Sequence, residues 1–217
     1  LTPEHYDAAT ARGEAADRMF VLPHGVHVPP RLALRDAARV ASTRRAFGVP
    51  NGTAMLLSVG MLDRTIKRMD MLVDAVAALG ADRPHLVLLG AETDETPALT
   101  TYVRDRLGTG AWMGTWPRER MAEAYEAADA FALLSLREGF GLAYVEALAA
   151  GLPCVAHDTP GTRHLLGDLG YLGDTVSPAA TAGLIRFALQ DGAAEALRGA
   201  RHRRAYERFS WDVLAPR

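Results

Sequence analysis

Two glutamates flank a glycine-rich turn in the segment REGFGLAYVEALAAGLP, which covers residues 137–153. Glu138 follows an apolar run, and Glu146 lies eight positions further along, inside a run with helical spacing. The glycines at 139 and 141 permit a tight turn and let backbone N–H groups approach a ligand closely. The start of the following helix adds unpaired N–H groups and the positive end of a dipole, which favour phosphate.

The spacing would let the two carboxylates reach different parts of one ligand. Glu146 lies about five residues into the expected helix, roughly 7–8 Å along its axis, whereas Glu138 lies in the turn. Hydroxyls at both ends and phosphate between them describe a nucleoside diphosphate sugar. The spacing by itself favours a plainer interpretation, in which Glu138 complements the helix dipole and Glu146 is solvated. The small apolar neighbours of Glu146 argue against a solvated position, because a partly buried carboxylate needs a partner.

Three other charged groups invite a functional interpretation. Lys67 opens an expected helix at the end of an apolar run, where an anionic ligand would lie, although a surface lysine in a basic turn has the same pattern. Asp94 and Glu95 could suggest a metal site, but no further oxygen ligands accompany them, so we expect a solvated loop and no metal. The basic run 201–208 could touch anionic lipid or an acceptor; we favour a solvated helix face.

The composition excludes several classes of protein. The 217 residues are 49% apolar with a formal net charge of −2, which permits a sizeable core and argues against a surface that binds nucleic acid. The one cysteine, Cys154, cannot form a disulfide within the chain and fits a reducing compartment. No apolar run is long enough to cross a membrane and no signal-peptide pattern opens the chain, so we expect a cytoplasmic protein. The chain begins at Leu1 rather than Met, as a piece of a longer protein would.

Apolar runs alternate with helical runs from residue 54 onward. This rhythm predicts an α/β domain of Rossmann-like type, with three layers and a mostly parallel sheet of about six strands. Ligands bind such sheets beyond the carboxyl ends of the strands, which directs attention to the loops 60–67, 90–96 and 135–141. The strands are expected at 54–60, 85–90, 110–116, 130–135, 153–158 and 170–173. The helices are expected at 4–19, 32–49, 67–80, 97–108, 118–129, from about 141, 178–191 and 193–209.

An ordered set of segments resembles one known family. EGFGLAYVEALAAGLPCVA resembles the E-x7-E signature of retaining glycosyltransferases with the GT-B fold, in the large family called glycosyl transferases group one, of the family-four type. Four further segments resemble the family in the same order: VLPHGV, SVGMLDRTIKRMDMLVDAVAAL, WMGTWPRERMAEAYEAADAFALLS and FSW. The resemblance spans roughly residues 20–211.

The resemblance implies a role for individual residues at the donor site. Glu138 would contact the hydroxyls of the donor sugar, Glu146 would bind the ribose hydroxyls, and Lys67 would neutralise the diphosphate. Backbone N–H groups would be offered to the sugar and diphosphate by Phe140, Gly141 and Leu142. Trp112 lies where the family holds the base, although an ordinary core tryptophan is at least as good an interpretation.

Two loops depart from the family pattern. The family commonly has an arginine directly after the glycine that closes the first strand, whereas Met61 follows Gly60 here. We expect Gly60 to line the donor site and Arg64 to supply the second cation. The family often has a glycine pair and a glutamate near 160–164, where this chain reads PGTRH; Gly161 and Thr162 could still line the phosphate site.

The resemblance also implies the organisation of the protein. Residues 20–217 would form the nucleotide-sugar-binding domain, one half of a GT-B fold. Residues 1–19 would be a linker or helix remnant from an N-terminal acceptor domain outside this chain, and a final helix would begin near Trp211. The parent would transfer a hexose with retention, without metal, and could contact a membrane peripherally. The chain alone would bind donor but transfer poorly. Two alternatives remain: a GT-B-type nucleotide-sugar epimerase and a non-catalytic nucleotide-sugar-binding module.

Overall fold

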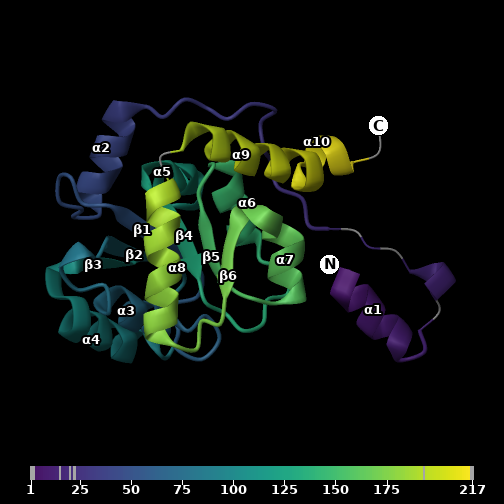
Figure 1. Ribbon diagram of the computed structural model, residues 1–217, viewed down its shortest axis with the longest axis horizontal. Coiled ribbons are helices and arrows are strands. Elements are labelled where there is room, and N and C mark those ends of the chain that lie inside the picture. Colours follow the sequence, from purple (N-terminus) through teal and green to yellow (C-terminus); the bar gives the residue numbers. More distant parts are fainter. Residues whose placement is uncertain (1–2, 15, 20, 22, 193, 216–217) are drawn as a thin grey trace.

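A computed structural model describes residues 3–14, 16–19, 21, 23–192 and 194–215 of the chain. A six-stranded sheet lies at the centre of the fold, with helices on both of its faces (Figure 1). Every neighbouring pair of strands runs parallel, in the order β3-β2-β1-β4-β5-β6. This confirms the predicted Rossmann-like fold class. The strands are β1 (Met55–Val59), β2 (His85–Leu89), β3 (Ala111–Gly114), β4 (Ala130–Leu133), β5 (Cys154–His157) and β6 (Gly170–Gly173).

The helices form two layers on the sheet. Helix α3 packs against α4 and α8, while α2 packs against α5 and α6 packs against α9. Figure 1 shows α8 in front of the sheet and α5 and α6 behind it. The helices are α1 (Pro3–Ala11), α2 (Ala37–Ala46), α3 (Met69–Ala77), α4 (Thr96–Leu107), α5 (Met121–Ala127), α6 (Leu142–Ala149), α7 (Pro160–Leu166), α8 (Pro178–Asp191), α9 (Glu195–Phe209) and α10 (Trp211–Leu214).

The strand order creates a switch point at the carboxyl ends of β1 and β4. From β1 the chain moves outward through β2 to β3, then returns across the sheet to place β4 on the other side of β1. The loops that leave β1 and β4 therefore diverge to opposite faces and leave a crevice between them, where ligands bind in folds of this type. All residues of β2 and β4 are buried, because helices cover both faces of the sheet.

Two helices near the amino end are shorter than the sequence predicts. The expected helix at 4–19 ends at Ala11, and Gly13 then adopts a positive φ of 89° that a right-handed helix cannot include. The expected helix at 32–49 begins only at Ala37. Asp36 fixes that start, because its carboxylate accepts the N–H groups of the second and third residues after it, at 2.9 and 3.1 Å.

Helix α7 was not predicted, and a local capping pattern explains it. The hydroxyl of Thr159 accepts the N–H of Thr162 at 3.1 Å, and the hydroxyl of Thr162 accepts the N–H of Thr159 at 3.0 Å. Pro160 occupies the first helical position, where a missing N–H costs nothing. A threonine followed by proline was therefore the available sequence signal.

The prediction of a solvated face for the basic run 201–208 is wrong for part of it. Arg201 and His202 are 1% and 2% exposed. The guanidinium of Arg204 donates to the carbonyl of Leu165 at 2.6 Å. Helix α9 crosses α6 at this point, so one side of the run faces the protein rather than solvent.

Segments from both ends of the chain meet beside Phe140, in the loop between β4 and α6. Val26 donates its N–H to the carbonyl of Phe209 at 2.8 Å and accepts the N–H of Trp211 at 3.0 Å. Phe140 packs edge-on against the rings of His24 and Phe209, with centroids 5.3 and 5.9 Å apart. Three segments that carry the family resemblance are thus in contact.

No helix in the described residues is long and apolar enough to cross a membrane.

Candidate functional site

Lys67 and Glu138 form an ion pair at the switch point. The Nζ of Lys67 lies 2.8 and 3.0 Å from the two carboxylate oxygens of Glu138, and the side chains are 16% and 15% exposed. Lys67 comes from the loop after β1 and Glu138 from the loop after β4. Two groups predicted to hold one ligand, 71 residues apart in sequence, are therefore in direct contact.

Asp63 shapes the loop that presents Lys67. This carboxylate is 3% exposed, and one of its oxygens accepts the N–H groups of Ile66 at 2.8 Å and of Lys67 at 2.6 Å. A Cβ added at Gly60 would lie 3.2 Å from the aliphatic chain of Lys67. The glycine at the end of β1 therefore lets the lysine lie close against the strand end, so Gly60 shapes the site as well as closing the strand.

The turn between β4 and α6 has the geometry that the glycines predict. Gly141 has a φ of 90° and caps α6, and a Cβ there would lie 2.8 Å from the ring of Tyr144. The hydroxyl of Tyr144 donates to the carbonyl of Leu133 at 2.5 Å, which ties the first turn of α6 to the end of β4. Leu142, at the first helical position, keeps its side chain 42% exposed. The first N–H groups of α6 thus lie beside the strand ends, as an anion site requires.

Glu146 is half-buried and has a tyrosine partner that the sequence did not reveal. Its Oε2 accepts the hydroxyl of Tyr125, from α5, at 2.7 Å. Burial, and then the negative charge of Glu146, raise the pKa of Tyr125 well above its ordinary value, so the hydroxyl stays protonated and donates. A cavity of about 380 Å³ opens beside the pair, lined in part by Met121 and His27.

Glu138 borders a different cavity, of about 450 Å³. Phe140, Gly161 and Thr162 also line it, as does Ala8 from α1. The structure therefore brings the loops after β4 and β5 together at one cavity. The hydroxyl of Thr162 donates to the carbonyl of His157 at 2.7 Å, and its N–H donates to Thr159 within the cap of α7, so both polar groups are already engaged in the fold.

Arg64 and Trp112 are not brought to the Lys67–Glu138 pair. The Nε of Arg64 lies 3.2 Å from a carboxylate oxygen of Asp70, and its guanidinium stacks 5.1 Å from the ring centroid of Tyr102 on α4. The ring of Trp112 packs against Phe47 with centroids 5.0 Å apart, as a core side chain does. Neither residue lines the cavity of Glu138 or of Glu146, and Lys67 and Arg68 also lie outside both linings.

The loop at 90–96 is hydrogen-bonded to the loop after β1. The carboxylate of Glu95 accepts the backbone N–H of Arg64 at 2.9 Å. Within the described ranges, no three His, Cys, Asp or Glu side chains gather where they could hold a metal ion.

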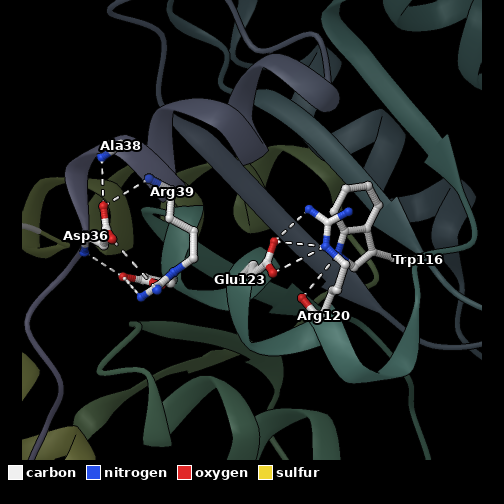
Figure 2. A network of polar contacts seen from close by, with 7 residues as sticks. Asp36, Ala38, Arg39, Trp116, Arg120 and Glu123 are labelled. Atoms are coloured by element: carbon white, nitrogen blue, oxygen red, sulfur yellow. Dashed lines mark hydrogen bonds and ion pairs between the residues drawn. The ribbon is translucent and has the colours of Figure 1, made fainter.

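Polar side chains surround α5, the helix from which Tyr125 reaches Glu146. Arg39 of α2, which is labelled in Figure 2, pairs with Glu126 of α5 at an Nε to oxygen distance of 2.8 Å. In the same view Arg120 pairs with Glu123 at 2.8 Å and lies 4.7 Å over the ring of Trp116. Both arginines are 46% exposed, so each pair stabilises little. The Arg39 pair joins α5 to α2, whereas the Arg120 pair lies within the first turn of α5.

Comparison with known proteins assigns a family. The model for the family described as glycosyl transferases group 1 matches residues 40–208. A D-inositol 3-phosphate glycosyltransferase of Xylanimonas cellulosilytica is 32% identical over 226 residues, covering 98% of this chain and 52% of the relative. One from Geodermatophilus obscurus is 33% identical over 209 residues, covering 90% of this chain and 45% of the relative. The chain spans about half the length of these curated relatives.

Solved structures share the fold. HepE of Anabaena, in complex with UDP, matches with a TM-score of 0.82 at 19% identity, covering 98% of this chain and 59% of HepE. Sucrose-phosphate synthase of Thermosynechococcus elongatus matches with a TM-score of 0.78 at 25% identity, covering 97% of this chain and 54% of that one. The chain corresponds to the C-terminal half of such GT-B structures. Because the family model covers most of its length, the chain belongs to the glycosyl transferases group 1 family.

Proposed function

We propose that residues 20–217 form the donor-binding domain of a retaining glycosyltransferase, which transfers a hexose from a nucleoside diphosphate sugar to an acceptor. The observation that carries this proposal is the contact between Lys67 and Glu138, beside the start of α6. A cation for the diphosphate and a carboxylate for sugar hydroxyls thus lie at the switch point. The curated relatives named above are glycosyltransferases, and HepE was solved with UDP, which makes UDP the first donor nucleotide to test.

The site residues divide the donor between them. When the donor binds, the Lys67 ammonium exchanges Glu138 for the diphosphate and stabilises the charge that grows on it as the sugar departs. The first N–H groups of α6 share that role. Glu138 is then free to accept hydrogen bonds from the sugar. Glu146 binds the ribose through the oxygen that Tyr125 does not occupy, so the two carboxylates position the donor.

The acceptor is bound by another part of the parent protein in this proposal. The relatives are about twice as long as the matched region, and residues 1–19 connect the donor domain to the acceptor-binding domain. The chain alone therefore binds donor and transfers sugar poorly.

Glu146→Ala is expected to weaken UDP binding about tenfold, because the ribose loses a charge-assisted hydrogen-bond acceptor. Isothermal titration with UDP, GDP, ADP and their glucose conjugates measures this and identifies the base. The matched control is Glu207→Ala, an exposed glutamate on α9. If the unmodified chain binds none of these nucleotides, the proposed function is wrong. If Glu146→Ala binds UDP as tightly as the unmodified chain, the proposed contact between Glu146 and the ribose is wrong.

Glu138→Gln is expected to act in opposite directions on two ligands. UDP binding should strengthen about threefold, because the diphosphate no longer competes with a carboxylate for Lys67. The additional affinity that glucose confers on UDP-glucose should fall, since an amide is a weaker acceptor for sugar hydroxyls. The two titrations are compared with Glu207→Gln. Unchanged UDP affinity would show that the ion pair does not oppose diphosphate binding.

A further inference from the structure

Arg68 adopts a backbone conformation that arginine ordinarily avoids. Its φ of 54° and ψ of 44° lie in the left-handed region, and among the described residues it is the one non-glycine with positive φ. The clash of Cβ with the backbone disfavours this region for most L-residues, and such strain persists where surrounding structure imposes it. The residue is also half-buried and caps α3 without a side-chain hydrogen bond. The position would suit glycine, yet it carries a long cationic side chain.

The strained backbone sends that side chain across the switch point. The Nη1 of Arg68 donates to the carbonyl of Leu134 at 3.1 Å. Leu134 follows β4 directly and begins the loop that carries Glu138. The consecutive residues Lys67 and Arg68 thus both reach the β4–α6 loop. Lys67 contacts Glu138, and Arg68 contacts Leu134.

The charge of Arg68 has no counter-ion within the described part of the chain, where every ion pair involves other residues. Its neighbour Arg64 differs, since Asp70 already neutralises it and Tyr102 holds its guanidinium. A guanidinium carries five N–H donors, and one bond to a carbonyl leaves donors for an anion. Hydrogen bonds to Asp63 also hold the loop at this point. The carboxylate of Asp63 accepts the N–H of Lys67, and the backbone carbonyl of Asp63 accepts the N–H of Met69 at 3.1 Å.

We propose that Arg68 is the second cation of the diphosphate site, in the role that the sequence assigned to Arg64. This rests on the proposed function, since it takes the nucleoside diphosphate as the ligand. Lys67 supplies a compact point charge, whereas the planar guanidinium of Arg68 binds two phosphate oxygens at once. Two adjacent cations from one loop then hold the diphosphate against the start of α6.

Arg68→Gly separates this role from a structural one, because it changes stability and binding in opposite directions. Glycine relieves the strained backbone, so the thermal unfolding midpoint should rise by about 2–4 °C. Loss of the guanidinium should weaken UDP binding about tenfold and make it less sensitive to ionic strength. Arg68→Asn is the second variant, because asparagine also tolerates this conformation. Arg104→Ala, which removes an exposed arginine of α4, is the matched control and should change neither property.

The outcomes distinguish this proposal from the proposed function. Suppose that the unmodified chain binds UDP, that Lys67→Ala weakens this binding, and that both Arg68 variants bind UDP like the unmodified chain. The diphosphate site then stands, and the role of Arg68 is overturned. If Arg64→Ala shows the tenfold loss instead, the second cation is Arg64. If both Arg68 variants bind weakly and also unfold at a lower temperature, Arg68 is a structural residue. If the unmodified chain binds no nucleotide, the proposed function itself fails.

Discussion

Replacing Gly90 by alanine is expected to destabilise the domain by about 4 kcal/mol or more, because the end of β2 has no room for an added methyl group. A Cβ added at Gly90 would lie 1.5 Å from the carbonyl oxygen of Gly60 and 2.6 Å from its carbonyl carbon. The obstacle is backbone, which cannot turn aside as a flexible side chain can. The carboxyl ends of β1 and β2 would have to separate, and the loop that carries Lys67 starts there.

Urea unfolding of Gly90→Ala measures this effect, with Gly183→Ala as the matched control. Gly183 lies within α8 and an added Cβ there would meet nothing within 4 Å. Alanine should therefore stabilise that helix by about 0.5–1 kcal/mol. A Gly90→Ala variant within about 1 kcal/mol of the parent would show that the close approach of the two strand ends is not rigid.

The parts of the fold that follow from local chemistry could be predicted from the sequence. Apolar runs without alternation predicted buried parallel strands, and HLVLL became the fully buried β2. The turn before α6 was predicted because glycine alone suits its positive φ at Gly141. The partial burial of Glu146 followed from its small apolar neighbours. Each inference needed only residues close to one another in the chain.

The features that the sequence could not reveal depend on direction in space. Arg64 and Arg68 are both arginines in the same loop, so the sequence does not distinguish them. The backbone dihedral angles of that loop decide which side chain points across the switch point. Tyr125 lies on another helix from Glu146, and their contact requires the packing of α5 onto the fold. The burial of Arg201 likewise depends on where α9 crosses α6, which helical spacing alone does not give.

Replacing Lys67 by alanine is expected to weaken UDP binding roughly 30- to 100-fold. A charge-assisted hydrogen bond contributes about 1.5–3 kcal/mol, and each 1.4 kcal/mol is about a tenfold change in affinity. The loss has a second cause here. Without the lysine, the largely buried carboxylate of Glu138 loses the ion-pair partner that the described residues give it and repels the diphosphate.

The double variant Lys67→Ala with Glu138→Gln separates these two causes. If repulsion by Glu138 contributes, the double variant should bind UDP about three- to tenfold more tightly than Lys67→Ala alone, although less tightly than the parent. Titration of the four proteins with UDP, and with UDP-glucose, gives the coupling between the two residues. Affinities that simply add would mean that the two side chains act independently, and then the ion pair would have no part in exchanging Glu138 for the diphosphate. A measurable coupling, by contrast, would mean that binding of the diphosphate releases Glu138 to meet the sugar.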